Sequence, residues 1–570
     1  MNKVFGIDLG TTYSCISYVD EFGKSVVLKN SEGENTTPSV VYYESLDNII
    51  VGNEAKNMLT AEPESTIAFV KRSIGTDDEN GNPVRFNFHG KEVSPEEISS
   101  KILKKLVNDA NDDLRNDGVL KEDEEIKDVV ITCPAYFGMR EKAATKLAGE
   151  LAGLNVLDII NEPTAAAINY GLLKKGNNKN VLVYDLGGGT FDVTVIQIND
   201  GEINVVYSDG DRNLGGKDWD QTVADYLAEE FERNTGTEYY VDEESANDIL
   251  LITERAKKSL SSKQVVKISL NSNGKRQVLE LTREKFDELT STLLQSTIYK
   301  VDECLENAAN GAFHVTLNDI DEILLVGGSS KMPQIAKTLE EKYKKNVSLF
   351  DPDEAVSKGA AAYALIRQDY KLVISEIAKK TGKTEAEVEQ TVNSGKKTLE
   401  EVAKDEKIDI ASISEGNGGQ LSLSSSVKIT DVLSRTYGVK VFDEERGVER
   451  ISNMLMKGQK LPANLIRNFV TLDATNRVSI CIYESESGRN EISVDEGTQL
   501  GEAEVVFPRT MRKGTPIEVN LFMDNSGLLK LIATEFETNT IVSAEFNPAG
   551  GLSGAEISEI KSRTQKEVVN

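Results

Sequence analysis

A glycine-rich turn between two acids is the stretch of this sequence best suited to chemistry. The run from Val181 to Val195 reads as an apolar strand, the turn Asp185-Leu186-Gly187-Gly188-Gly189-Thr190-Phe191-Asp192, and a second apolar strand. Glycines have no Cβ, so their amides can approach an anion closely, while the two carboxylates can hold a divalent cation through water. The pattern predicts a phosphate-gripping β-hairpin, although a plain glycine turn between buried strands would look similar.

A second hairpin of the same kind lies near the amino terminus. The run from Val4 to Ser14 again reads strand, Asp8-Leu9-Gly10, threonine, strand. Two such turns, far apart in sequence, can face each other across one cleft and surround a polyphosphate from both sides. The internal duplication therefore favours a phosphate site.

Other polar residues could complete that site. Lys71, in an apolar stretch, could orient an attacking water or stabilise a transferring phosphate, and Glu162 directly precedes a proline at a predicted helix start. One helix face carries Glu254, Lys257, Lys258 and Ser261, and the turn Gly327-Gly328-Ser329 follows a strand. Each also has a plainer interpretation: a surface lysine, a capping acid, a solvated helix face and a simple αβ turn.

The composition narrows the function classes. A chain of 570 residues predicts two or more domains, and a formal net charge of -29 argues against a nucleic-acid-binding surface. The 4 cysteines are far apart, which favours reduced thiols, and only 2 histidines are present, so carboxylates, lysine and bound metal are better candidates for catalysis. With no leader or membrane-spanning run evident, we expect a cytoplasmic protein.

The pattern of elements divides the chain into four parts. Residues 1–368 alternate short β-branched strands with amphipathic helices, as in an α/β protein; residues 369–426 are rich in Lys, Glu, Thr and Ser and read as an insertion and linker. Residues 427–548 predict an all-β domain, and 549–570 a short helix. In the first part we expect strands at Val4–Asp8, Asp128–Thr132, Val181–Asp185, Phe191–Ile198 and Ile323–Val326, and helices at Pro95–Asn116, Arg140–Ala152, Pro163–Leu172, Asp220–Arg233, Ala246–Ser261 and Arg283–Ala309.

Taken together, these motifs resemble the actin-like ATPase superfamily and, within it, the seventy-kilodalton heat-shock, or DnaK-type, chaperones. The resemblance covers residues 3–368 and again 427–562. It rests on Ile7–Ser14, Pro134-Ala135-Tyr136-Phe137, Asn161-Glu162-Pro163-Thr164-Ala165-Ala166-Ala167, Asp185–Thr194, Leu214-Gly215-Gly216, Glu254–Ser262 and Val326–Pro333, in that order. It implies an actin-like (ribonuclease H-like) two-lobed ATPase domain, a β-sandwich that binds peptide, and a lid helix.

The resemblance also implies roles for individual residues. The catalytic set would be Asp8, Lys71, Glu162, Asp185 and Thr190, with Lys71 and Glu162 flanking the hydrolytic water. Asp8, Asp185 and Asp192 would arrange magnesium, water and potassium. ATP or ADP would be held by Gly10, Thr11, Thr12, Tyr13, Gly187, Gly188, Gly189, Gly215, Gly216, Glu254, Lys257, Lys258, Ser261, Gly327, Gly328, Ser329, Lys331 and Asp353. Lys258 and Lys331 would sandwich the adenine, where the family usually places Arg at one or both positions.

In the carboxy-terminal half the resemblance implies a cleft for an extended apolar peptide. Its lining would be Val439, Phe442, Phe469, Leu472, Val478 and Ile480, although Phe469 and Val478 could equally be sandwich core. The partners implied are unfolded client peptides, a J-domain co-chaperone and a nucleotide-exchange factor.

Several positions depart from the family's pattern. The linker Ser426-Val427-Lys428-Ile429-Thr430-Asp431 has polar residues at two positions where the family has large aliphatics, so we expect weaker docking of the linker on the ATPase domain. Asp158 stands where bacterial relatives carry an Arg that meets the J-domain, and the loop after Ser262 is short, which argues against both co-chaperones. The lid is expected to be a single helical stub, so peptide exchange should be fast.

The sequence as a whole predicts an ATP-hydrolysing chaperone. One rival is a small-molecule kinase of the actin-like superfamily, for which an appended β-sandwich has no obvious use. A second is a non-hydrolysing ATP-binding scaffold, which the retained Lys71 and Glu162 disfavour. A P-loop is excluded because Gly23-Lys24-Ser25 and Gly382-Lys383-Thr384 both lack the earlier glycine of that motif.

Overall fold

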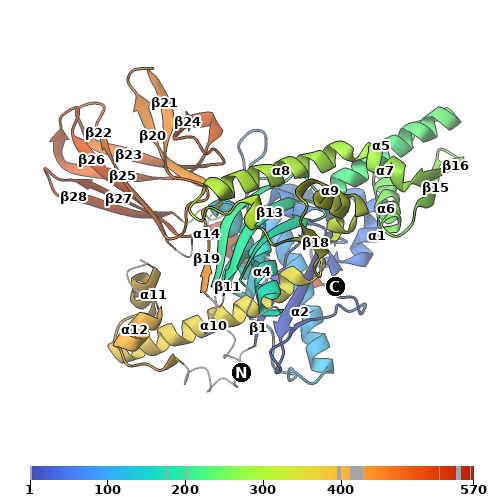
Figure 1. Cartoon of the computed structure of the whole chain (residues 1–570), viewed down its shortest axis with the longest axis horizontal. Coiled ribbons are helices and arrows are strands. Elements are labelled where there is room, and N and C mark those ends of the chain that lie inside the picture. Colours follow the sequence, from blue (N-terminus) through green and yellow to red (C-terminus); the bar gives the residue numbers. More distant parts are fainter. Residues whose placement is uncertain are drawn as a thin grey trace.

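The computed structural model describes residues 3–173, 178–199, 202–393, 399–410, 428–524, 527–546, 554–564 and 567–570. Ser426 and Val427 of the linker lie outside the described residues. The chain forms a two-lobed α/β body with a β-sandwich at one end (Figure 1). Within the described ranges, no helix combines the length and apolarity needed to cross a membrane.

Lobe I is built on a sheet in the order β11-β10-β1-β2-β3, with β4 paired to β2. Its first two strands form the amino-terminal hairpin, in which Asp8 pairs with Cys15. The strands are β1 (Val4–Asp8), β2 (Tyr13–Val19), β3 (Ser25–Val27), β4 (Thr37–Pro38), β10 (Asp128–Cys133) and β11 (Asn155–Asn161). A smaller sheet in the same lobe contains β5 (Val40–Tyr43), β6 (Asn48–Val51) and β7 (Thr66–Ala68).

Lobe II repeats this plan with the order β18-β17-β12-β13-β14-β19. Its hairpin pairs Asp185 with Asp192, so the duplication expected from the sequence is present as two hairpins, each opening one sheet. The strands are β12 (Lys179–Leu186), β13 (Phe191–Asn199), β14 (Glu202–Asp211), β17 (Glu322–Val326), β18 (Asn346–Leu349) and β19 (Lys428–Thr430).

Two helices fill the space between the sheets. The core between the sheets contains Val4 and Val130 from lobe I and Val181 and Leu324 from lobe II. Apolar residues of the two helices, α4 (Glu162–Leu173) and α10 (Ala355–Thr381), complete it. The packing is close: a Cβ on Gly359 of α10 would lie 1.7 Å from the carbonyl oxygen of Ala165 in α4. This shared helical layer fixes the two hairpins relative to each other.

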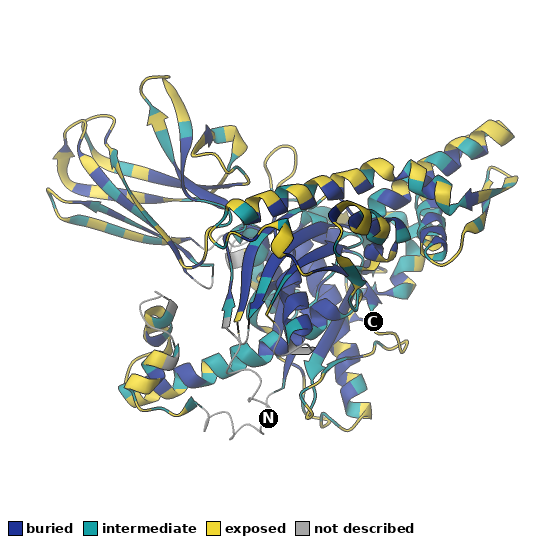
Figure 2. Ribbon diagram, viewed as in Figure 1, coloured by how far each residue is buried: buried dark blue, intermediate teal, exposed yellow. Residues whose placement is uncertain are grey.

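The remaining helices cover the outer faces, and buried residues concentrate in the sheets beneath them (Figure 2). In lobe I these are α1 (Asn53–Ala61), α2 (Pro95–Asn116) and α3 (Met139–Leu151); α4 (Glu162–Leu173) and α10 (Ala355–Thr381) form the central layer. Lobe II has α5 (Gly216–Thr235), α6 (Glu243–Leu260), α7 (Arg283–Leu289), α8 (Ser291–Asn310) and α9 (Pro333–Tyr343), with the hairpin of β15 (Val265–Ser272) and β16 (Lys275–Thr282).

The predicted elements of the first part are all present, with two corrections. The helix expected at Arg283–Ala309 is broken at Thr290, whose hydroxyl donates to the carbonyl of Phe286 at 2.8 Å. The boundary expected at residue 368 falls inside α10, which continues without a break to Thr381. The first residues assigned to the insertion therefore form the end of α10, against which α11 (Glu385–Asn393) and α12 (Leu399–Asp405) pack a small apolar core.

The linker docks on lobe II as a strand. β19 pairs in parallel with β14, with Ile203 opposite Ile429 and Asn204 opposite Thr430. Backbone pairing of this kind does not need large aliphatic side chains, and Ile429 still packs against the inter-sheet core. The two polar substitutions have therefore not prevented the linker from docking.

The β-sandwich packs two antiparallel sheets around one apolar core. One sheet has the order β24-β21-β20-β23-β25 and the other β22-β26-β27-β28. The strands are β20 (Thr436–Asp443), β21 (Val448–Leu455), β22 (Ala463–Val470), β23 (Thr475–Ser485), β24 (Glu491–Ser493), β25 (Thr498–Met511), β26 (Pro516–Met523), β27 (Leu529–Glu535) and β28 (Thr540–Phe546). The all-β prediction for this part is confirmed.

The short helix expected after the sandwich is present and packs on lobe I. α14 (Gly554–Thr564) packs Ile557 and Ile560 against Leu147 and Leu151 of α3, in lobe I. A final strand, β29 (Val568–Val569), joins the small sheet of lobe I beside β6. The apolar face of α14 is therefore buried on the ATPase body, and the role of this helix as a lid stays a prediction.

Candidate functional site

A cavity of about 800 Å³ lies between the two lobes and is lined by both hairpin turns. Of the residues predicted to bind a nucleotide or to catalyse its hydrolysis, all but Gly189, Gly215 and Gly216 line it. Asp192, predicted as a metal-site residue, lies behind the lining and is almost fully buried. The folding of the chain therefore gathers the predicted residues into one place.

The two glycine turns contact each other so closely that side chains would not fit. A Cβ on Gly188 would lie 1.8 Å from the hydroxyl of Thr12, and one on Gly189 would lie 2.2 Å from the methyl of Thr11. A Cβ on Gly215 would lie 2.5 Å from the carbonyl carbon of Gly189. The buried hydroxyl of Thr12 has no hydrogen-bond partner among the described residues. It can therefore bind a ligand held by the two glycine turns, which together form a glycine cradle.

Three buried carboxylates converge beside these turns. Burial, followed by the charge of Glu162, raises the pKa of Asp8 to about 7, and the same two causes raise the pKa values of Asp185 and Asp192. Two of the carboxylates accept hydrogen bonds that position them: the Thr132 hydroxyl donates to Asp8 at 3.2 Å, and the amide of Ala135 donates to Asp192 at 2.9 Å. The surroundings therefore disfavour the ionised form of all three carboxyl groups.

Lys71 is the cation nearest to this cluster. It is buried and forms an ion pair with Glu162, and although burial lowers its pKa, Glu162 and Asp8 together raise it above the ordinary value. Its neighbour Arg72, which the sequence gave no reason to select, donates from Nε to the carbonyl of Gly189 at 2.8 Å and pairs with Asp218 at 2.7 Å. Arg72 thus fixes the glycine turn of lobe II from lobe I.

A second network closes the opposite side of the cavity. Glu254 accepts ion pairs from Lys56 at 2.5 Å and from Lys258 at 2.8 Å, and both lysines donate to the Tyr13 hydroxyl. Burial opposes ionisation of Glu254, but Lys56 and Lys258 outweigh it and lower its pKa to about 2. Sequence reasoning missed Lys56, because its partner is 198 residues away and no local pattern marks it.

Two residues predicted to bind the nucleotide, Lys257 and Lys331, have their ammonium groups paired with acids of the protein. The buried ammonium of Lys257 donates to the carbonyl of Gly216 at 2.7 Å and to Asp220 at 2.6 Å. Lys331 forms an ion pair with Asp353 at the edge of the cavity. Lys257, Lys258 and Lys331 all line the cavity.

The residues present fit a triphosphate with a divalent cation. In the described part of the chain, no three Asp, Glu, His or Cys side chains form a complete metal site on their own. The raised pKa values of Asp8 and Asp185, the glycine cradle and the unpartnered Thr12 hydroxyl suit a cation whose remaining ligands are phosphate oxygens and water.

The residues predicted to line a peptide cleft divide into three groups. Val439 and Ile480 are buried in the sandwich core, and their role in peptide binding stays a prediction. Phe469 and Val478 are half-buried against the same core. Phe442 and Leu472 are exposed, each at 42%, at the end of β20 and just beyond β22.

The sandwich docks on lobe I close to the carboxylate cluster. Arg435 donates to the carbonyl of Tyr136 at 3.0 Å, next to Ala135, whose amide binds Asp192. Asp431 accepts a hydrogen bond from Asn161 at 3.1 Å, next to Glu162. Two separate chains of contacts thus run from the candidate site to the first residues of the sandwich.

Lysine and arginine side chains of the sandwich lie close to acids of the ATPase body at this interface. Lys457 of the sandwich donates to Asp209 at 2.8 Å, and Arg435 lies 3.8 Å from Glu141. Burial, followed by the charge of Glu141, raises the pKa of Glu484 to about 7, while Arg435 and the amide of Met139 favour its ionised form. The interface needs no ligand to complete it.

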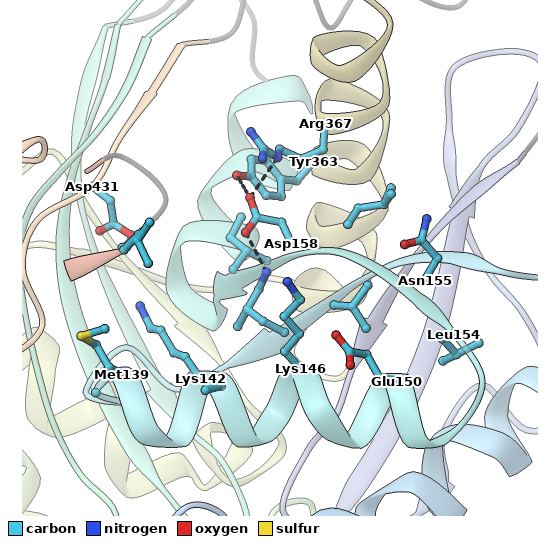
Figure 3. Close-up of a pocket in the computed structure, with 18 of the residues that line it drawn as sticks. Met139, Lys142, Lys146, Glu150, Leu154, Asn155, Asp158, Tyr363, Arg367 and Asp431 are labelled. Carbon is cyan, nitrogen blue, oxygen red and sulfur yellow. Dashed lines mark hydrogen bonds and ion pairs between the residues drawn. The ribbon is translucent and has the colours of Figure 1, made fainter. Parts of the chain in front are cut away.

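A larger cleft of about 1160 Å³ lies between α3, α10 and the linker (Figure 3). Lys142 and Lys146 point into it from α3, and Asp158 lies opposite them. Asp158 pairs with Arg367 at 2.9 Å and accepts a hydrogen bond from Tyr363 at 2.8 Å. The acid expected to reverse the charge of this surface is therefore neutralised by an arginine from α10.

Two ribonuclease H-like lobes, each opening with an Asp-Gly hairpin and joined by a shared helical layer, define an actin-like nucleotide-binding domain followed by a β-sandwich. A family model described as Hsp70 protein matches residues 4–378, and the chain belongs to that family.

Curated relatives agree with this assignment. The chaperone protein DnaK of Thermosipho africanus is 43% identical over 370 residues, which is 64% of this chain and 59% of that protein. The chaperone protein DnaK of Thermotoga maritima is 43% identical over 372 residues, with the same coverage. The match thus spans about three fifths of the relatives' length.

Proposed function

We propose that this protein is an ATP-hydrolysing chaperone that binds extended apolar segments of unfolded proteins. The observation that carries the proposal is the convergence of Asp8, Asp185, Lys71 and Glu162 around a glycine cradle in one interlobe cavity. Membership of the Hsp70 family and the appended β-sandwich support it, since a small-molecule kinase would have no use for the second domain.

In this proposal the hairpin turns bind the phosphates. The amides of Gly187 and Gly188 and the hydroxyls of Thr11, Thr12 and Thr190 line the anion, with Arg72 keeping the turn of lobe II in position. Lys71 stabilises charge on the transferring phosphoryl group, and Glu162 orients Lys71 and the attacking water. Such chemistry relies on positioning and charge rather than on covalent intermediates.

A divalent cation such as Mg²⁺ would supply charge neutralisation at the phosphates when bound. Asp8 and Asp185 would hold its water ligands, and Asp192, with potassium, would complete the charge balance behind them. Asp8 and Asp185, whose pKa values are raised by burial, would be favoured in their ionised form by a cation held there.

The nucleoside would lie at the far end of the cavity. The aliphatic stems of Lys258 and Lys331 flank the base, and the Tyr13–Glu254–Lys56 network closes the cavity over it. Because this network crosses from lobe I to lobe II, it links the closure of the two lobes to nucleotide binding.

The signal would reach the sandwich through the two contact chains that leave the site. A change at Asp192 would move Ala135 and Tyr136, which contact Arg435, and a change at Glu162 would move Asn161, which contacts Asp431. The exposed Phe442 and Leu472 are then the sandwich residues best placed to meet a client. With Asp158 paired to Arg367, the cleft between α3 and α10 presents Lys142 and Lys146 to an acidic co-chaperone surface.

Phosphate release in a single turnover, with product analysis, tests this proposal. We expect free phosphate from ATP and Mg²⁺, with no phosphorylated small molecule, and loss of the activity in Lys71→Ala. A stoichiometric phosphorylated metabolite would favour a kinase instead, and ATP binding without phosphate release would favour a scaffold.

A further inference from the structure

The carboxy-terminal residues form a bound strand on lobe I. β29 pairs in parallel with β6, with Val568 opposite Asn48 and Val569 opposite Ile49, so the small sheet has the order β29-β6-β5-β7. The amides of Val568 and Asn570 donate to Asp47 and Ile49 at 3.0 and 2.9 Å. Strand addition of this kind is how many proteins capture extended peptides.

The side chains alternate between the protein and solvent. Glu567 and Val569 are buried, and Val569 joins the core of lobe I, whereas Val568 and Asn570 are exposed. Alternation is what a groove beside a sheet edge requires, because every second side chain points inward. The groove therefore holds the acidic side chain of Glu567 and, two residues later, the aliphatic side chain of Val569.

A fully buried lysine is dedicated to the tail. The ammonium of Lys101, on α2, pairs with the carboxylate of Glu567 and donates to the Thr564 hydroxyl at 3.3 Å, so both of its hydrogen bonds go to this segment. Its ion-pair partner among the described residues of lobe I is Glu97, at 3.8 Å. Lys104 adds a bond to the backbone carbonyl of Glu567 at 2.7 Å. A buried cation with its donors aimed at one segment is costly unless that segment is bound.

We propose that lobe I carries a peptide-binding groove of its own, formed by the edge of β6 and the Lys101 and Lys104 face of α2, that captures an extended Glu-x-Val segment by strand addition. Its occupant is residues Glu567–Asn570 of the same chain. This groove is separate from the sandwich. The protein thus has two sites for extended chains: the sandwich binds apolar segments, and the groove binds a segment with one acidic and one aliphatic side chain.

Capture of the tail ties the two halves of the molecule together. The chain leaves the sandwich after Phe546 and is fixed again on lobe I from α14 onward. With the groove filled, the sandwich is tethered at both of its ends, to lobe II by β19 and to lobe I by β29. The effective concentration of the tethered tail keeps the groove filled without high intrinsic affinity.

Hydrogen exchange of the full-length chain tests the capture. The amide of Val51 donates to the carbonyl of Asn570 at 2.9 Å and reports directly on groove occupancy. Val568→Pro removes the donor to Asp47 at an exposed position and should raise exchange at Val51 about tenfold or more. Val568→Ala, which keeps that donor, is the matched control and should change exchange by less than about twofold. Equal exchange at Val51 in wild type and Val568→Pro would overturn the proposal.

A labelled peptide tests recognition. The probe is a fluorescent peptide of residues 561–570, measured by anisotropy against both full-length proteins. We expect it to bind Val568→Pro, whose groove is vacated, and not wild type, and we expect a probe with the change Glu567→Lys to fail. Binding of both probes alike, or of neither, would show that the segment is only a structural strand and would overturn the recognition of Glu-x-Val.

Discussion

The nucleotide cavity and the sandwich interface both bury carboxylates but balance them differently. In the cavity Asp8, Asp185 and Asp192 share Lys71 with Glu162, and burial raises their pKa values. At the interface Asp209 faces its own cation, Lys457, which overcomes the effect of burial and lowers the pKa of that acid. The cavity is thus built for an added cation, whereas the interface is complete without a ligand.

The largest effect should come from removing the shared cation of the cavity. Lys71→Ala, and likewise Thr190→Ala, should lower the single-turnover rate of ATP hydrolysis by roughly 100-fold or more, because each stabilises charge that develops in the transition state. Lys24→Ala, at an exposed turn, is the control and should retain the full rate. Unchanged rates in both cavity variants would remove the catalytic assignment.

The next effect concerns stability and separates the two regions sharply. Asp185→Asn should abolish hydrolysis yet raise the melting temperature of the nucleotide-free protein, because the buried Asp185 must either bind a proton or carry an unfavourable charge when the chain folds, and Asn does neither. Each kcal/mol gained would raise the midpoint by about 2–4 °C. A lower melting temperature than wild type would mean that the cluster is already balanced.

Removal of a charged side chain at the interface should destabilise the docked state of the sandwich. Lys457→Ala leaves Asp209 with only the more distant Lys300, at 3.4 Å, and should weaken docking by about 1–3 kcal/mol. Small-angle scattering and exchange at β19 would report the undocking. Lys460→Ala, on the same turn but facing Phe313, should have little effect. Undiminished docking in Lys457→Ala would show that the backbone pairing of β19 dominates.

The smallest effect is a pH dependence of docking. Burial first, then Glu141, raises the pKa of Glu484 to about 7, so the docked state holds this proton more tightly than the free state, where the ordinary value is 4.5. Its contribution to docking is full below about pH 4.5 and is lost as the pH rises through about 7. Arg435 and Arg140 face the same group and limit the loss. Glu484→Gln should remove this dependence; an identical pH profile in the variant would assign it elsewhere.

Local patterns were enough to predict the two hairpins and the residues that they carry. Asp8 and Asp185 each sit at a strand end followed by glycine, and the pairing of such strands needs only neighbouring residues. Arg72 and Lys56 were missed because their partners, Gly189 and Glu254, are more than a hundred residues away and come together only through the shared helical layer.

Errors arose where tertiary contacts override local preference. Thr290 breaks a helix that the apolar periodicity continued, and α10 extends past the expected boundary because α11 and α12 pack against its end. The linker was judged by its side chains, whereas it docks by its backbone. The periodicity of α14 predicted a helix correctly but could not tell which surface it covers.

The rate at which a bound peptide leaves the sandwich, with and without ATP and Mg²⁺, tests the central claim most directly. The contacts of Asp192 and Glu162 with the residues that hold Arg435 and Asp431 predict that ATP accelerates release by about tenfold or more. The same rate with and without ATP would contradict coupling between the cavity and the sandwich, even if the cavity hydrolyses ATP.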